Sequence, residues 1–388
     1  MTDRLYLADS HLSSCSATVT ACHGTADGYD LELDRSVFFP NAGGQPSDTG
    51  TFTLPDGGTV AITGADELDD GTLFHHAAAP VAPGTAVTAA IDWDRRFDLM
   101  QQHSGEHMVS GVIHRRWGYE NVGFHMGADM ITIDLSGELT MEDLREVEQE
   151  VNSRIWRDDR VKIWYPSPEE LKEIPYRSKK ELTGAIRIVE FPGADICACC
   201  GTHVERTGAI GLVKLLTCTK FHEGVRVEML CGGRAVDYLT RAFDQNRLVS
   251  QQLSAKVMET AQAVAGISAE LAEKKQQLYA MEEAAFAARA KELTGAGDVA
   301  VFLENLNPDG VRRAAVAIQD TCSGRAAVFS GSDETGYKYA VGLPGGDLRT
   351  WVREFNSALK GRGGGKPFFV QGSLQASRAE IEAYLSCH

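Results

Sequence analysis

Cys197-Ala-Cys199-Cys200-Gly201-Thr202-His203 is the stretch around which the rest of the chain is organised. It places a thiolate and an imidazole four positions apart, at the end of a predicted strand. Far upstream, His103-Ser-Gly-Glu-His107 has two imidazoles at i and i+4, which lie on one face of a helix. Each pair alone is also typical of residues that bind no metal. Together they favour a metal site, because they offer four ligands of the kind that tetrahedral Zn²⁺ takes, namely His103, His107, Cys199 and His203.

Length and composition indicate an ordinary globular protein. The chain has 388 residues, of which 43% are apolar and 24% charged, enough for two to four domains with separate cores. No apolar run approaches the ~20 residues of a membrane span, and the first residues do not resemble a signal peptide. We therefore expect a cytoplasmic protein with no membrane partner. Nine cysteines at this length fit reduced thiols and a metal better than a disulfide framework.

The charge distribution limits where a nucleic acid could bind. A net charge of −16 argues against phosphate contacts over most of the surface. Residues 295–388, however, hold ten Lys and Arg against ten Asp and Glu, so the excess of acid lies in residues 1–294. Within this neutral end, Lys360, Arg362 and Lys366 follow one another on a glycine-rich stretch without an acid. We expect that stretch to be a flexible loop, which suits a phosphate backbone but is also typical of a solvated turn.

The predicted fold class is α+β. Residues 1–98 alternate short apolar runs with turn signals, which predicts a small antiparallel barrel or sandwich. Residues 99–233 mix strands and helices, which predicts an α+β zinc-binding domain packed on the barrel, with its strands in one sheet. Residues 234–294 predict a helical hairpin or coiled-coil linker. Residues 295–388 predict a small α/β domain.

Two helical predictions bear on the site and the linker. Residues 98–117 predict an amphipathic helix that ends at Gly118 and carries both histidines of the upstream pair on its apolar face. The linker repeats apolar residues every seven positions, with a bend expected at Gly266, and we expect this stripe to be packed within the chain. The repeating residues are Val257, Val264, Leu271 and Leu278.

A glycine-rich motif lies inside the first segment. Gly43 and Gly44 let the backbone approach a ligand closely or adopt positive φ, and Gln45 offers both a donor and an acceptor. On spacing alone, a hairpin turn with a solvated glutamine is favoured over a ligand site.

These motifs together resemble a known family. The stretches 38–50, 103–107, 199–204 and 207–214 are similar, in this order, to the editing domain of alanyl-tRNA synthetase and to its free-standing relatives, the AlaX proteins. The resemblance covers residues 1–240. The linker and the glycine-rich stretch near Lys366 resemble the C-terminal DHHA1-type domain, which marks the long form of AlaX. The aminoacylation domain is absent.

The resemblance implies roles for individual residues. It makes His103, His107, Cys199 and His203 the zinc ligands, and it places Gln45 with Gly43 and Gly44 beside the substrate. Ser36 stands where a threonine that reads the serine hydroxyl is expected. Two positions depart from the family, since Cys200 and Ala42 stand where glycine is usual. The three cations of the tail become tRNA contacts.

The implied function is hydrolysis in trans of tRNA(Ala) mischarged with serine or glycine. A pocket built for alanine cannot exclude glycine by size, nor reject serine by more than ~10²-fold, so a second hydrolytic site is needed. A full shell of four ligands would leave zinc an organising role, whereas a loose ligand would let it activate water. We expect Glu106 to be solvated or to lie behind the ligands, and a homodimer through the linker or tail is possible.

Two alternatives from other classes stay open. One is a non-catalytic tRNA-binding or regulatory relative. The other is a zinc-dependent hydrolase of a small ester or amide, which the acidic surface favours. Release factors also carry a Gly-Gly-Gln tripeptide, but on an exposed loop without accompanying metal ligands.

Overall fold

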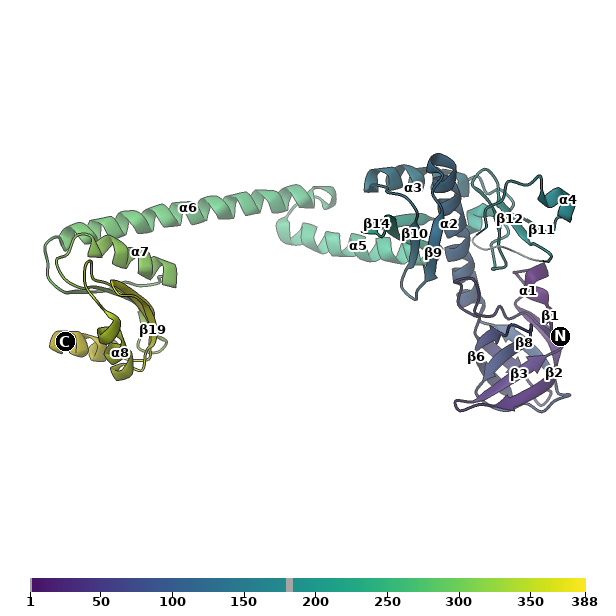
Figure 1. Ribbon diagram of the computed structural model, residues 1–388, viewed down its shortest axis with the longest axis horizontal. Helices are drawn as coiled ribbons and strands as arrows, with labels where there is room; N and C mark the ends of the chain where they lie inside the picture. Colours follow the sequence, from purple (N-terminus) through teal and green to yellow (C-terminus); the bar gives the residue numbers. More distant parts are fainter. Residues whose placement is uncertain (1, 179–183) are drawn as a thin grey trace. The chain divides into compact units, whose positions relative to one another are not determined.

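The computed structural model describes residues 2–178 and 184–388, and the chain divides into two compact units, Met1–Asn246 and Arg247–His388. The first unit contains a barrel and an α+β part (Figure 1). The second contains a long helix and a five-stranded sheet. In the part of the chain that the structure describes, we find no helix with the length and apolarity needed to span a bilayer. The α+β class is confirmed.

The first segment is a closed antiparallel barrel. Its strand order is β2-β3-β7-β6-β5-β8, so every strand has two neighbours and no edge is left open. Alternate residues of each strand point inward, as in β6, where burial alternates with exposure along the strand. The strands are β2 Ser14–Gly24, β3 Tyr29–Leu33, β5 Gly50–Thr53, β6 Thr59–Glu67, β7 Leu73–Ala77 and β8 Ala86–Ile91. Two short strands, β1 Asp3–Arg4 and β4 Arg35–Ser36, pair beside α1 Leu5–Ala8.

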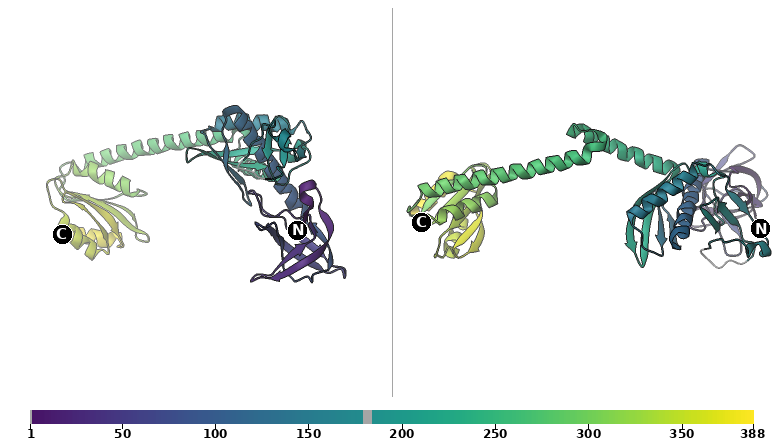
Figure 2. Two further views of the ribbon diagram at one scale, coloured as in Figure 1. Left: turned by 45° about the vertical axis from the view of Figure 1, so that its right-hand side comes forward. Right: turned by 90° about the horizontal axis from the view of Figure 1, so that it is seen from above.

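Helix α2, Trp93–Trp117, leads from the barrel into the α+β part of the unit (Figures 1 and 2). It begins five residues earlier than predicted, because the side chain of Asp92 accepts a hydrogen bond from Arg95 N and caps the helix. It ends as predicted at Gly118, which has φ +73°. The prediction of an amphipathic helix is wrong, since every residue from 102 to 113 is buried. The α+β part, together with Gln45 of the first segment, covers this stretch.

The α+β part contains two sheets, not the single sheet expected. The first has the order β14-β15-β10-β9, and the second the order β11-β12-β13. Strand β13 ends at the cysteine motif and contacts α2, so this small sheet carries the motif to the helix. The strands are β9 Asn121–Met126, β10 Ile131–Leu135, β11 Lys162–Trp164, β12 Ile188–Phe191, β13 Asp195–Ala198, β14 Val213–Phe221 and β15 Gly224–Cys231. Helix α3 Met141–Ile155 has the predicted capping box at Thr140, and α4 Pro168–Leu171 and the 3₁₀ turn η1 Thr207–Ile210 complete the part.

The linker is helical, but its interruption is not at Gly266. Helix α5, Gly232–Leu253, spans the boundary between the units and is followed by the 3₁₀ turn η2 Val257–Glu259 and by α6 Thr260–Glu292. Ser254 has φ +50°, outside the helical region, whereas Gly266 lies within α6. The predicted packing of the apolar stripe is wrong for α6, because Val264, Leu271 and Leu278 are 49%, 53% and 58% exposed.

After the linker, the second unit contains a five-stranded sheet with three helices among the described residues. Its sheet has the order β16-β17-β18-β20-β19, with strands β16 Val299–Phe302, β17 Ala326–Ser332, β18 Gly336–Gly342, β19 Arg362–Lys366 and β20 Phe369–Leu374. Its helices are α7 Pro308–Gln319, α8 Arg349–Ala358 and α9 Arg378–Cys387.

The expectation that the glycine-rich stretch is a loop is wrong, because residues 362–366 form the exposed edge strand β19. A Cβ at Gly363 would lie 2.4 Å from Gln371 O and 2.5 Å from the hydroxyl of Tyr339. Glycine therefore lets this strand approach β20 closely.

Candidate metal centre

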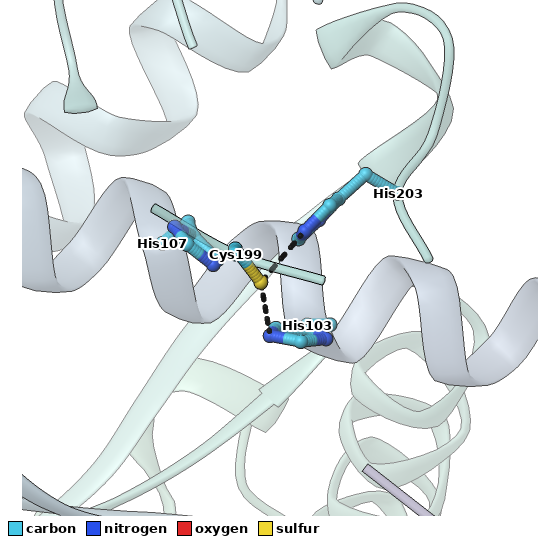
Figure 3. A group of neighbouring side chains, drawn as sticks. All are labelled: His103, His107, Cys199 and His203. Carbon is cyan, nitrogen blue, oxygen red and sulfur yellow. Dashed lines mark hydrogen bonds between the residues drawn. The ribbon is translucent and has the colours of Figure 1, made fainter. Parts of the chain in front are cut away.

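Four side chains from α2 and from the turn after β13 converge on one point. The ligand atoms of His103, His107, Cys199 and His203 all lie within 4.8 Å of one another. Cys199 Sγ is 3.6 Å from His103 Nε2 and 3.4 Å from His203 Nε2. Figure 3 shows the sulfur of Cys199 among the three imidazole rings. The sequence paired these residues from far apart, and the fold brings all four together.

Gln45 orients the first imidazole. Its Oε1 accepts hydrogen bonds from His103 Nδ1 at 2.8 Å and from Thr202 N at 3.2 Å, while its Nε2 donates to Thr202 Oγ1 at 2.7 Å. Because Nδ1 carries the proton, the Nε2 lone pair of His103 is free to face Cys199. Gln45 is fully buried, so the solvated glutamine expected from spacing is wrong.

Asp195 and Ser104 orient the other two imidazoles. Asp195 Oδ2 is 2.9 Å from His107 Nδ1, and Arg177 holds the same carboxylate through both oxygens at 2.8 and 2.9 Å. Ser104 Oγ is 3.3 Å from His203 Nδ1. Each ring thus has its Nδ1 engaged by the protein, which leaves Nε2 as the ligand atom.

The electrostatics of the cluster favour a thiolate. Burial raises the pKa of Cys199, but charge interactions with His103, His203 and His107 outweigh it and hold that pKa well below its ordinary value. Gly201 N also donates to Cys199 Sγ at 3.3 Å. Burial lowers the pKa of His203 to about 3, so this imidazole is neutral. Burial lowers the pKa of His107, but the charge of Cys199 and hydrogen bonds with Asp195, Cys197 and Cys199 raise it well above its ordinary value. One cysteine sulfur and three imidazole nitrogens are a ligand set of tetrahedral zinc, and these residues fit that ion.

Asp195 keeps its charge inside the protein. Burial raises its pKa, but hydrogen bonds and charge interactions with His107 and Arg177 lower it below the ordinary 3.8. A carboxylate behind a ligating histidine is the usual outer partner at zinc sites. Asp195 also forms a second possible ligand group with His107 and Cys197. Because its two oxygens are already held by Arg177 and His107, we assign it to the supporting layer.

The glycine-rich motif forms the tight turn predicted from its sequence. Ala42 and Gln45 pair through both backbone hydrogen bonds, at 3.1 and 3.0 Å, and Gly43 and Gly44 between them have φ +62° and +85°. A Cβ at Gly44 would lie 2.7 Å from the ring of Phe124. The turn therefore needs glycine both for its backbone and for its packing against β9.

A buried ion pair fastens this motif to α2. Arg96 Nε donates to both oxygens of Asp48, at 2.9 and 3.1 Å, and Asp48 Oδ2 accepts from Phe39 N at 2.6 Å. Arg96 and Asp48 are both completely buried. Since Arg96 lies seven residues before His103 on the same helix, α2 holds the glycine motif at one point and takes Gln45 two turns later.

The cluster borders a cavity of about 890 Å³, large enough for a nucleoside with its aminoacyl group. Ala42, Gly43, Gly44, Cys200 and Gly201 are among the residues that line it. Cys200 is exposed, in contrast to Cys199. The remaining lining residues are Phe39, His103, His107, Glu120, Asn121, Val122, Gly123, Phe124, Arg177, Ser178, Ala185, Ile186, Arg187, Cys197, Ala198 and Cys199.

Two predicted side chains lie elsewhere. Ser36 is not among the residues that line this cavity: it is buried in the barrel, where its Oγ bonds to His75 Nε2 at 2.7 Å and accepts from Phe38 N at 3.0 Å. The geometry gives it no free group for a substrate. Glu106 is 1% exposed and accepts from Ser110 Oγ at 2.7 Å and from Asn121 Nδ2, so the solvated alternative for Glu106 is wrong.

The tail cations occupy the second unit. Arg362 and Lys366 lie on the exposed strand β19, and Lys360 precedes it. Sequence reasoning missed the four residues that support the metal ligands, which are Ser104, Arg177, Asp195 and Thr202. Ser104 and Thr202 each adjoin a ligand in sequence, which was the available signal, whereas no motif indicated Arg177.

Comparisons with known proteins extend this description. The family model for the second additional domain of threonyl and alanyl tRNA synthetases matches residues 186–228, which include Cys199 and His203. The DHHA1 domain model matches residues 296–385. The alanyl-tRNA editing protein AlaX-L of Pyrococcus horikoshii is 26% identical over 98% of this chain and 96% of its own length. The chain is a relative of the AlaX-type editing proteins. This confirms the resemblance predicted from the motifs.

Other AlaX-type and synthetase relatives show how much of each protein is shared. An alanyl-tRNA editing protein of Xenopus laevis is 26% identical over 97% of this chain and 95% of its own length. The alanine–tRNA ligase of Halorubrum lacusprofundi is 28% identical over 96% of this chain but only 42% of its own length. The chain thus matches the editing proteins almost end to end and the ligase in part.

Proposed function

We propose that this protein is a trans-editing hydrolase that removes serine or glycine from mischarged tRNA(Ala). The observation that carries the proposal is the set of three histidines and one cysteine at the wall of a cavity beside the Gly43-Gly44 turn. The AlaX-type relatives, which are named as alanyl-tRNA editing proteins and match nearly the whole chain, support it.

The reaction is ester hydrolysis, which needs an oriented water and stabilisation of the carbonyl oxygen. Zn²⁺ held by His103, His107, Cys199 and His203 would supply a Lewis-acid charge beside the ester. Gln45 and Asp195 keep two of the imidazoles turned toward that charge. Gly44, which also lines the cavity, allows the terminal ribose to approach the backbone closely.

The site must spare alanine. A polar group that bonds the serine hydroxyl is left unpaired when alanine binds, which costs about 1–3 kcal/mol in a desolvated pocket. The cavity wall offers Cys200 for this contact, in place of Ser36. Ala42 lines the cavity next to the glycine turn and limits the space there. We expect serine to be preferred over glycine, because only serine offers a hydroxyl for the polar contact.

The second unit is proposed to bind the tRNA body. Arg362 and Lys366 lie on the edge strand β19, in which every residue is exposed, and Lys360 precedes that strand. Three cations on an accessible edge suit phosphates. Exchanging all three for glutamine should weaken tRNA(Ala) binding and lower the salt slope by about three, while single-turnover hydrolysis of bound Ser-tRNA(Ala) is retained.

The exposed stripe on α6 supports a homodimer through the linker or the C-terminal domain. Sedimentation of the full chain and of a variant with Leu271 and Leu278 changed to Lys would test this, and a monomer for the unaltered chain would contradict it. We place the protein in the cytoplasm, where charged tRNA is used.

The decisive experiment is deacylation of Ser-, Gly- and Ala-tRNA(Ala) by the zinc-loaded full chain. We expect release of serine, slower release of glycine and retention of alanine. A Cys199→Ser variant serves as the control for contaminating hydrolases. Intact ester after hours would support a tRNA-binding role without turnover. Salt-insensitive cleavage of a small serine ester, with no preference for tRNA, would support a small-ester hydrolase.

A further inference from the structure

One buried arginine beside the candidate metal centre forms no ion pair with an acidic residue among the described parts of the chain. Arg187 lies directly before β12 and is 3% exposed. Its Nη1 donates to the carbonyl oxygens of Cys199 at 2.8 Å and Gly201 at 3.0 Å, and its own carbonyl accepts from Cys199 N at 3.1 Å. Arg187 therefore holds the turn that carries the thiolate, from the side that faces the cavity.

Two other arginines of this unit, one buried and one mostly buried, make the contrast clear. Arg96 pairs with Asp48, and Arg177 pairs with Asp195. For Arg187, no carboxylate within residues 2–178 and 184–388 forms an ion pair, and its Nε is buried without any hydrogen-bond partner. Buried charges in proteins are normally paired, and a buried donor without an acceptor costs about 1–3 kcal/mol.

The position of the Arg187 side chain suggests which group accepts its remaining hydrogen bonds. Arg187 lines the cavity together with Cys199, Cys200 and Gly201, so this residue forms part of the wall that a substrate would contact. A guanidinium presents its donors in a fixed fork, and Nη1 occupies only one branch. An anionic oxygen is the acceptor that best fits the remaining N–H donors of the guanidinium.

We propose that Arg187 binds an anionic oxygen of the substrate at the cavity wall. This inference rests on the proposed function. An aminoacyl-tRNA offers such an oxygen from two sources: the phosphodiester next to the terminal nucleoside, and the oxyanion that forms during hydrolysis. In the second case, water adds to the carbonyl carbon of the ester, and the carbonyl oxygen becomes the anion. When the carbonyl re-forms, the bond to the ribose oxygen breaks, and that oxygen takes the proton that water has lost. Arg187 donates a hydrogen bond and transfers no proton.

The test uses the full zinc-loaded chain with Arg187→Gln and Arg187→Lys. We measure zinc content, kcat and KM for Ser-tRNA(Ala), and binding of uncharged tRNA(Ala) at several salt concentrations. We expect both variants to keep their zinc and the Gln variant to lose about 100-fold in kcat/KM. Arg160→Gln, at an exposed arginine of the same unit, should equal the unaltered protein.

The two sources give different results. Contact with the oxyanion lowers kcat, leaves binding of uncharged tRNA(Ala) unchanged and is not restored by lysine. Contact with the phosphodiester raises KM, weakens binding of uncharged tRNA(Ala), lowers the salt slope by about one and is partly restored by lysine.

Either of two results would overturn the inference. One is an unchanged kcat/KM in Arg187→Gln. The other is loss of zinc in proportion to activity in both variants, which would reduce Arg187 to a support of the cysteine turn. If the unaltered protein fails to deacylate Ser-tRNA(Ala), the proposed function fails, and the binding of uncharged tRNA(Ala) still tests Arg187 by itself.

Discussion

His75 in the barrel and His103 in the metal cluster are both buried imidazoles, yet the protein treats them differently. His75 Nδ1 bonds to Leu31 O at 3.0 Å and its Nε2 to Ser36 Oγ at 2.7 Å, so both nitrogens are used. His103 uses Nδ1 for Gln45 and turns Nε2 toward Cys199. Burial alone therefore does not distinguish a ligand from a core histidine. The distinction is whether the second nitrogen has a protein hydrogen-bond partner or faces a thiolate.

This difference predicts the largest effect at the thiolate itself. Cys199→Ser should lower zinc affinity by more than about 100-fold. This is a larger decrease than the loss of a residue that only supports a ligand would cause. Cys200→Ser is the matched control, since its thiol is exposed and outside the ligand group. Zinc content after dialysis measures both. Retention of the metal in the Cys199 variant would point to Cys200 or Cys197 as the true ligand.

The stability of the barrel should depend on pH because of His75. Burial lowers the pKa of His75 from 6.5 to about 4. Because the unfolded chain then binds a proton that the folded barrel does not, stability is full above pH 6.5 and falls as the pH drops toward 4, by about 3 kcal/mol. Hydrogen exchange of barrel peptides measures this loss. A His75→Gln variant should lose less stability over the same pH range. A loss equal to that of the unaltered protein would exclude His75 as the cause.

The supporting carboxylate should have an intermediate effect on the metal. Asp195→Asn keeps an acceptor for His107 but removes the charge, and should weaken zinc binding 10–100-fold. Its low pKa adds a second expectation: the stability that Asp195 contributes is present above pH 3.8 and is lost as the pH falls through its lower folded pKa. Competition with a chelator gives the affinity. Unchanged affinity would remove Asp195 from the metal site.

The smallest effect is expected at Ser36. Ser36→Ala removes the hydroxyl partner of His75 and of Phe38 N, and should lower the unfolding free energy of the barrel by about 1 kcal/mol. Zinc content and the preference for serine over alanine should be unchanged. A loss of that preference would restore Ser36 as the residue that reads the substrate.

The sequence by itself determined the elements with local causes. The glycine turn at residues 42–45, the stop of α2 at Gly118 and the capping box at Thr140 each depend on a few neighbouring residues. The two ligand pairs were also visible, because helix geometry and motif spacing set the separation within each pair. The residue order that resembles AlaX proteins needed no coordinates.

Only the tertiary structure decided how these parts meet. The enclosure of α2, the division of the strands into two sheets and the partners Asp195 and Arg177 depend on contacts between residues distant in the sequence, which no local pattern specifies. The strand at Arg362–Lys366 forms because β20 is beside it, although its glycines alone predict a loop. Chain connectivity places His75 and His103 in different cores, and that placement decides which of the two faces a thiolate.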